Sequence, residues 1–461
     1  MSGTQDYFEI GDEDLLAQIE LQSVSVDTGE RALGAESRLK SVLDDIRARI
    51  GTLLKTETVS FLLGAGASVA CGGELIGAVP LKIENALQEK GSSSRRRVRR
   101  WLEIFYLAAK YSSRGGAVPV SREEILERRD MLREGGTQSI QANFEQVLAT
   151  LHRWRSALPG TGGRLRVDSA LTLDAKSNDI EECLRQATGA LAKACELPTI
   201  ERNDGLLAYK TLIRKLLTRP LNLKRVNIFT LNYDTLVEQA ADAEGVVLLD
   251  GFVGTQRRVF RPESYEQDLY FPAETTEGRV HRFDRVLHLY KLHGSVTWTA
   301  NEPTIDNPYG VQSAAFSPDG GQLVLIYPTP AKYGETLNLP YSELFRRFAS
   351  TIVRPQSVLF VIGYGFGDEH VNTILRQALA IPSFTLVIVD PAPQSRFVKT
   401  LREQRDRRVW IAEGPKLGTL AGFVDQALPD LREEEVLKKV LSTHRALASG
   451  SAVGGDLRDG E

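Results

Sequence analysis

Cysteine and long apolar runs are scarce in this chain of 461 residues, and their scarcity excludes several classes of protein. The three cysteines, Cys71, Cys183 and Cys195, are scattered, and no two of them form a Cys-x-x-Cys pair. This spacing argues against a disulfide framework and against a four-thiolate zinc site, so we expect no metal and a reducing cytoplasm as the setting. No run reaches the ~18 apolar residues of a membrane span, and the first residues lack the features of a signal peptide. We therefore expect a cytoplasmic protein that does not contact a membrane.

Neither sign of charge dominates, because 57 basic and 60 acidic residues give a formal charge of −3. This balance argues against a nucleic-acid grip over the whole protein, although local basic patches remain open. The run Arg95 to Arg100, followed by Trp101, is such a patch, since guanidinium groups beside an aromatic ring suit phosphate and bases. A solvated helix start explains the same run and is the favoured interpretation. Direct binding of nucleic acid is left open.

The stretch Val59 to Ser68, Val-Ser-Phe-Leu-Leu-Gly-Ala-Gly-Ala-Ser, combines a short apolar strand pattern with a turn of small residues. Without a Cβ, Gly64 and Gly66 can take positive φ and let a pyrophosphate approach the backbone, while a following helix directs its free N–H groups at the anion. Glycines that serve packing alone would give the same pattern. The stretch therefore predicts a nucleotide loop without proving one.

Two common nucleotide motifs do not fit this loop. A kinase-type phosphate loop would need Lys and then Ser or Thr after its last glycine, and neither is present. A dehydrogenase fingerprint would place a third glycine at Val69 and an acidic residue at the end of a second strand ~20 residues later. Glu84 has about that spacing, but it lies in a helical pattern. The loop belongs to neither class.

Strand and helix patterns alternate through most of the chain, which predicts an α/β fold with a doubly wound, parallel, Rossmann-like sheet. The region after the first loop is instead a series of helices with glycine-rich connections, which predicts an inserted helical subdomain. We expect an N-terminal extension over 1–40, a nucleotide-binding domain over 41–82 and 205–447, the helical subdomain over 83–204, and a disordered tail over 448–461. One C-terminal helix is expected from about Leu417 to Leu447. Between Trp298 and Pro340 only one short strand is predicted, Leu323 to Tyr327.

Polar side chains follow several of the predicted strands. Asn232 and Asp234 come after the strand that ends at Leu231, and ligands of an open parallel sheet bind at this edge. Either residue alone can instead be a helix cap. His293 lies beside Gly294 and Ser295, which are expected to end a strand, and has the context of a catalytic base, whereas His288 lies within the apolar run and is expected to be structural. Asp368 precedes a helix and is expected to be an N-cap.

Five ordered motifs together resemble the nucleotide-binding core of the sirtuin superfamily, over roughly residues 55 to 415. They are Gly64-Ala-Gly-Ala-Ser68, Thr230-Leu-Asn-Tyr-Asp234, Lys291-Leu-His-Gly-Ser295, Gly363-Tyr-Gly-Phe-Gly-Asp368 and Val389-Asp-Pro391. The chain departs from sirtuin deacylases because it has no paired Cys-x-x-Cys zinc ligands. It is more similar to the zinc-free, sirtuin-like NAD hydrolases of bacterial defence against phage, with the helical insert in place of the zinc module.

The resemblance implies roles for individual residues. Asn232 would order the nicotinamide ribose or the attacking water, Asp234 would contact the carboxamide, and His293 matches the base of the family. The remaining candidates would bind the dinucleotide: the pyrophosphate by Gly64, Ala65, Gly66 and Ser68, the adenine side by Gly363 and Gly365, and a ribose hydroxyl by Asp390.

The implied activity is NAD+ glycohydrolysis, which gives nicotinamide and ADP-ribose or its cyclic form and depletes NAD+ in abortive infection once triggered. NAD+ is then a substrate rather than a resident cofactor. By analogy we expect a homo-oligomer and a partner such as a HerA-type ATPase or an Argonaute-like protein. Two alternatives stay open, a non-catalytic module that senses NAD or ADP-ribose and a zinc-free protein deacylase.

Overall fold

A nine-stranded sheet forms the centre of the computed structural model. The structure describes residues 5–17, 30–90, 95–112, 118–157, 164–166, 172–174, 176–197, 205–271, 281–314, 323–325 and 340–432. The strand order is β2 (Glu13–Asp14), β1 (Tyr7–Ile10), β16 (Val409–Glu413), β15 (Phe384–Asp390), β14 (Ser357–Ile362), β3 (Thr58–Leu63), β6 (Asn227–Thr230), β10 (Val286–Lys291) and β7 (Val247–Leu249). All strands from β16 to β7 in this order are parallel to their neighbours.

The chain order of the strands creates a switch point beside β3. From β3 the chain continues to β6, β7 and β10 on one side, and it later returns to β14, which pairs with β3 on the other side. Ligands of open parallel sheets bind in the crevice at the carboxyl ends of strands that diverge in this way. The predicted doubly wound fold is confirmed, and its crevice lies between the two glycine-rich loops.

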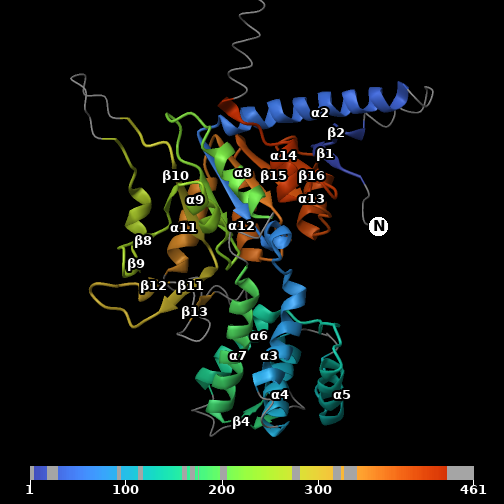
Figure 1. Cartoon of the computed structure of the whole chain (residues 1–461), viewed down its shortest axis with the longest axis vertical. Helices are drawn as coiled ribbons and strands as arrows, with labels where there is room; N and C mark the ends of the chain where they lie inside the picture. Colours follow the sequence, from blue (N-terminus) through green and yellow to red (C-terminus); the bar gives the residue numbers. More distant parts are fainter. Residues whose placement is uncertain are drawn as a thin grey trace, which may run out of the picture.

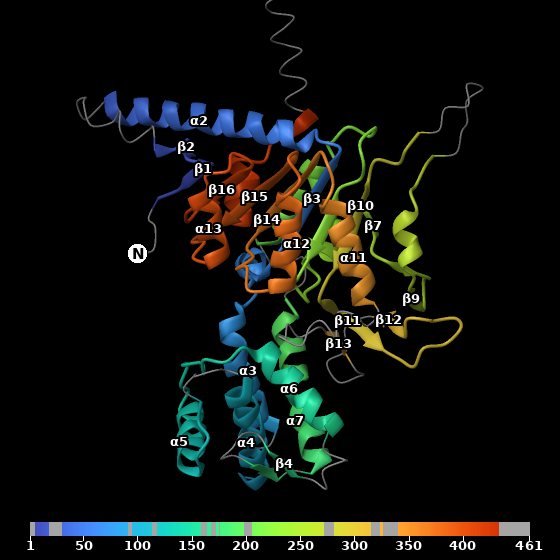
Figure 2. The same ribbon diagram turned by 180° about the vertical axis from the view of Figure 1, so that it is seen from behind.

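Helices cover both faces of the sheet, as Figures 1 and 2 show from opposite sides. One face packs against α2 (Glu30–Leu54), α8 (Leu206–Leu216), α9 (Leu236–Ala243) and α14 (Leu420–Gln426). The other face packs against α11 (Tyr341–Ile352), α12 (Glu369–Leu379) and α13 (Arg396–Gln404). The central strands β3, β6 and β14 are buried along their whole length, as expected for a sheet covered on both sides.

A separate helical cluster lies beyond the carboxyl ends of the strands, in blue to green in Figure 1. It consists of α3 (Val79–Lys90), α4 (Arg95–Ser112), α5 (Arg122–Arg133), α6 (Phe144–Ala157) and α7 (Ser177–Cys195), with a small hairpin of β4 (Arg164–Arg166) and β5 (Thr172–Asp174). Its core contains a buried ion pair in which the Arg128 guanidinium donates to both oxygens of Glu84 at 2.9 and 2.8 Å. Glu84 therefore has a structural role within this cluster.

The basic run of the sequence forms the first turns of α4. Trp101 is buried, so its ring is not exposed for stacking on a base, and the Arg97 guanidinium lies 6.0 Å from the centre of that ring. Arg100 pairs with Glu103 at 3.0 Å. The run therefore has local partners, and contact with nucleic acid stays an open prediction.

The structure contains a second, five-stranded antiparallel sheet, which was not expected from the sequence although the strand predicted at Leu323 is one of its members. Its order is β13 (Leu323–Leu325), β11 (Gly294–Ala300), β12 (Val311–Ser313), β9 (Arg258–Phe260) and β8 (Phe252–Val253). Gly294 and Ser295 begin β11, so they do not end a strand as expected. Most of these strands are three residues or shorter, and proline and polar residues between them obscure their alternation.

Both ends of the described chain differ from the predictions. Residues 1–40 were expected to be an extension, but β1 pairs antiparallel with β16 and α2 begins at Glu30. Phe8 and Ile10 are buried in the main core, and this two-residue alternation is too short to stand out among acidic neighbours. Within the described residues, the helix expected from Leu417 to Leu447 is interrupted: α14 ends at Gln426 and helical structure begins again at Leu431, while residues 433–461, which include the rest of that prediction and the predicted tail, lie outside the described residues. No helix in the described parts is long and apolar enough to cross a membrane.

His288 makes the folded state sensitive to acid. Its Nε2 atom is buried without a hydrogen-bond partner among the described residues, and burial lowers the pKa of the imidazole to about 4. The unfolded chain, with a pKa near ~6.5, therefore takes up a proton as the pH falls, while the folded chain does not. Stability from this residue is complete above about pH 6.5 and is lost toward about pH 4.

We expect wild-type protein to lose about 2 kcal/mol more unfolding free energy than His288→Leu between about pH 7.5 and about pH 5. Urea denaturation at both pH values measures this difference. Equal losses in the two proteins would contradict the burial of a neutral imidazole.

Candidate active site in the crevice between two glycine loops

The two glycine-rich loops contact each other backbone to backbone at the switch point. The Gly64 N–H donates to the Ile362 carbonyl at 2.9 Å, and the Gly66 N–H donates to the Gly363 carbonyl at 2.8 Å. A Cβ atom on Gly64 would lie 2.6 Å from the Gly363 oxygen, and one on Gly66 would lie 2.8 Å from the Gly363 Cα. The glycines are therefore required by the close approach of the loops.

This arrangement corrects the predicted backbone of the first loop. Gly64 has φ −110° and Gly66 is not among the residues with positive φ, whereas Gly363 has φ +65°. The segment after Gly64 is a short 3-10 helix, η1 (Ala65–Cys71), and the first α-helix after it is α3. Loop-to-loop packing accounts for Gly64 and Gly66, and the left-handed conformation is needed at Gly363 instead.

Asn232 and Asp234 lie on the turn between β6 and α9, where they share the hydroxyl of Ser68. Asn232 Nδ2 donates to the Gly64 carbonyl and to Ser68 Oγ, both at 2.9 Å. Ser68 Oγ in turn donates to Asp234 Oδ2 at 2.7 Å and lies 3.2 Å from the hydroxyl of Tyr209. Asp234 Oδ1 accepts from the Leu236 N–H at 3.2 Å and so also helps to begin α9. The described residues donate no hydrogen bond to Asn232 Oδ1.

Ser68 is buried, and its hydroxyl is hydrogen-bonded to the side chains of Asn232 and Asp234. Tyr209, the fourth member of this network, comes from α8 and had no signal in the sequence. Burial raises the pKa of Tyr209 well above its ordinary value, so the phenol remains protonated. The network fixes the orientation of the Asn232 amide from three different elements.

His293 lies in the tight turn between β10 and β11 and is paired with Asp368. The His293 Nε2 atom lies 3.2 Å from Asp368 Oδ2, and both side chains are buried. Asp368 also caps α12, because its Oδ1 accepts from the His370 N–H at 2.9 Å. The expected N-cap is therefore present, but the same carboxylate also orients an imidazole. The sequence signal for this second role was weak, because 75 positions separate the two residues.

All ten candidate residues line one cavity of about 1300 Å³. Besides these residues, the cavity is lined by parts of α6, α7 and the start of α14, including Phe144, Leu191, Cys195 and Thr419.

Asp390 lies at the end of β15, where burial raises the pKa of its carboxyl and the Ala392 N–H partly opposes the shift. Burial also raises the pKa of Cys195 to about 12, so this thiol is protonated at neutral pH and is a poor nucleophile. No cluster of three metal-ligating side chains occurs among the described residues.

The helical cluster reaches the turn that carries Asn232. Tyr233 and Val296 belong to the hydrophobic core of the cluster, together with residues of α4, α6 and α7. The Val296 N–H donates to the Tyr233 carbonyl at 3.0 Å. Tyr233, the residue between Asn232 and Asp234, therefore packs against the helical cluster and also lines the cavity together with its neighbours.

The close approach of the loops makes Gly363 difficult to replace. We expect Gly363→Ala to lower the free energy of unfolding by about 2 kcal/mol or more, because a Cβ would meet the backbone of Gly66 and the residue has positive φ. Gly367→Ala is the matched control, since a Cβ there meets nothing within 4 Å. Chemical denaturation of both variants makes the comparison, and equal midpoints would contradict this account of the loops.

Part of the chain is similar to a known family of protein domains. No curated protein matched. A solved structure described as a Sir2 homologue in complex with NAD matched with a TM-score of 0.30 and 11% sequence identity, covering 78% of this chain and 91% of that chain. The model of the SIR2-like domain matched residues 226–413. This part of the chain, which carries Asn232, His293, Gly363 and Asp390, is therefore similar to the SIR2-like domain.

Proposed function

We propose that the chain is a NAD+ glycohydrolase that cleaves NAD+ to nicotinamide and ADP-ribose. The observation that carries the proposal is the convergence of the Asn232 amide and the His293–Asp368 pair on one cavity at the switch point. The match to the SIR2-like domain supports an NAD-related activity, and the size of the cavity is ample for a dinucleotide.

The proposed chemistry needs one base and one orienting amide. Nicotinamide leaves the cationic pyridinium as a neutral molecule, so no general acid is required for the leaving group. With the Nε2 proton of His293 donated to Asp368, Nδ1 carries the lone pair and can accept a proton from water or from a ribose hydroxyl. Asn232 Oδ1 can accept a hydrogen bond from the same water without bringing a charge to the site.

The same proposal assigns the rest of the cavity to the dinucleotide. Gly64, Ala65 and Gly66 would hold the pyrophosphate, with Gly363 and Gly365 toward the adenine and Asp390 on a ribose hydroxyl. Asp234 would contact the carboxamide. Ser68 would act mainly by fixing Asn232 and Asp234, since its hydroxyl contacts both of them.

An unregulated NAD+ hydrolase would deplete its own cell, so we further propose that activity is held off until a signal of phage infection arrives. The resemblance of the five sequence motifs to sirtuin-like defence proteins supports this role, whereas the match to the SIR2-like domain supports only the NAD-related activity. A separate partner, such as a HerA-type ATPase or an Argonaute-like protein, would then deliver the signal to an oligomer.

Nicotinamide release from NAD+ tests the activity. We expect release by wild-type protein, alone or with lysate of phage-infected cells, and a loss of about 10²-fold or more in Asn232→Ala and in His293→Ala. His281→Ala is the matched control, because His281 is exposed and does not line the cavity. If no nicotinamide were released in any condition although NAD+ still bound, the chain would be a sensor of NAD+ rather than a hydrolase.

Asp368→Asn separates the two roles of the carboxylate. Asparagine caps helices as well as aspartate does, so α12 should be retained, but the amide cannot stabilise a protonated His293. We expect kcat to fall at least about 10-fold while the melting temperature changes little. If kcat were unchanged, the His293–Asp368 pair would not take part in the reaction.

A further inference from the structure

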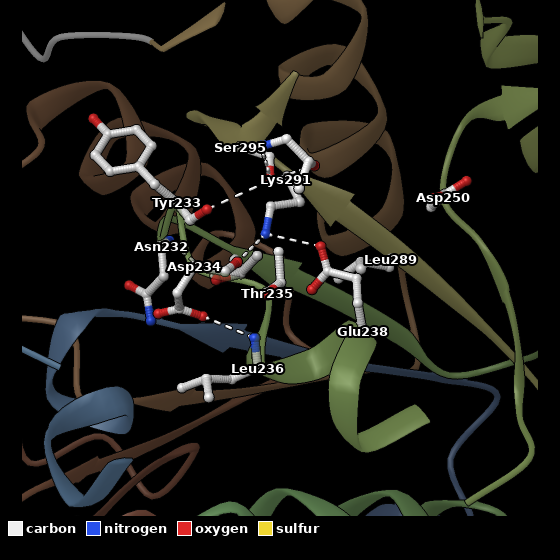
Figure 3. Close-up of polar contacts among 12 residues, drawn as sticks. Asn232, Tyr233, Asp234, Thr235, Leu236, Glu238, Asp250, Leu289, Lys291 and Ser295 are labelled. Atoms are coloured by element: carbon white, nitrogen blue, oxygen red, sulfur yellow. Dashed lines mark hydrogen bonds and ion pairs between the residues drawn. The ribbon is translucent and has the colours of Figure 1, made fainter. Parts of the chain in front are cut away.

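Lys291 is a buried cation beside the candidate active site that none of the proposed steps uses. It is the last residue of β10, and only 3% of its surface is exposed. As Figure 3 shows, its ammonium group points at the turn after β6, where it donates to the Asp234 carbonyl. It also pairs with Glu238 Oε1 in the first turn of α9 at 3.0 Å.

The position of Lys291 links the two segments that carry the candidate catalytic residues. It contacts the backbone two residues after Asn232, and it precedes His293 by two residues. Further hydrogen bonds join the same two segments: the Leu292 N–H donates to the Thr230 carbonyl at 2.9 Å, and Ser295 Oγ donates to the Tyr233 carbonyl at 3.4 Å. Among these links only that of Lys291 involves a charged side chain.

We propose that Lys291 is a positioning residue that sets the distance between Asn232 and the His293 turn. This inference depends on the proposed function of the same site. Burying an ammonium group is costly unless it is paired and hydrogen-bonded, and Lys291 has both kinds of partner. Glu238 balances the charge, while the bond to the Asp234 carbonyl holds the turn.

The geometry predicts an effect on the chemical step. Asn232 Nδ2 donates to the Gly64 carbonyl and to Ser68 Oγ, while Lys291 holds the backbone of the same turn at Asp234. Without the ammonium group the turn loses that support, and a misplacement of about 1 Å in an active site can cost about 10²-fold in rate. Dinucleotide contacts at Gly64 and Gly363 come from other strands and should be retained.

The test uses full-length Lys291→Met and the double variant Lys291→Met/Glu238→Gln. Lys291→Met leaves the Glu238 carboxylate without its cation, and Glu238 Oε2 already has no hydrogen-bond partner among the described residues. This variant should therefore lose stability as well as activity. The double variant removes both charges, so we expect its melting temperature to recover toward that of wild-type. Its kcat for NAD+ should stay about 10- to 100-fold low, with KM changed less than about 3-fold.

Arg225→Met is the matched control. Arg225 lies at the amino end of β6, far from the carboxyl ends of the strands, and forms a comparably buried ion pair with Asp268 at 2.7 Å. The Arg225→Met variant should lose stability, but it should not show the selective loss of kcat expected for the Lys291 variants. Recovery of both kcat and stability in the double variant, or an unchanged kcat, would show that Lys291 is merely structural.

A crystal structure of the double variant gives a readout that does not need turnover. We expect Asn232 Nδ2 to move away from the Gly64 carbonyl, and an unmoved amide would overturn the proposal. If wild-type protein released no nicotinamide, the proposed function would fail, while this structural comparison would still decide whether Lys291 positions the turn.

Discussion

The backbone contact between the Gly64 and Gly363 loops is the constraint on which the crevice depends. It joins the carboxyl ends of β3 and β14, where the chain order of the sheet diverges. A side chain at either glycine would separate the loops, because a Cβ would enter the space of the opposite backbone. Because β6 pairs parallel with β3 and β10 pairs parallel with β6, the polar turn after β6 and the histidine turn after β10 lie at the same edge of the sheet and line the same cavity.

Two carboxylates at this site combine a helix cap with a contact to another candidate residue. Asp368 begins α12 and orients His293, and Asp234 begins α9 while it accepts a hydrogen bond from Ser68. The sequence offered a helix cap or a ligand contact as alternatives for such a residue, and neither alternative alone describes what the carboxylate does. A helix cap and a catalytic contact use different oxygens of one carboxylate, so evidence for one does not exclude the other.

The helical cluster is part of the site as well as an addition to the fold. Its helices α6 and α7 line one wall of the cavity, and its core holds Tyr233 beside Asn232. A displacement of the cluster would therefore also move the turn that carries the Asn232 amide. Lys291 contacts the same turn from the sheet, so both structural units support the turn that carries Asn232.

The sequence by itself determined the alternating strand and helix pattern and the helical character of the inserted region, because both depend on local apolar periodicity. The resemblance of five sequence motifs to the sirtuin superfamily supplied ten candidate residues, and all ten are among those that line the cavity. Only the tertiary structure decided which glycine needs positive φ, that Asp368 faces His293 and that Tyr209 and Lys291 support the site, because these contacts join distant segments. The short strands β1, β8 and β12 also escaped prediction, since strands this short gain their stability from neighbours rather than from a local pattern.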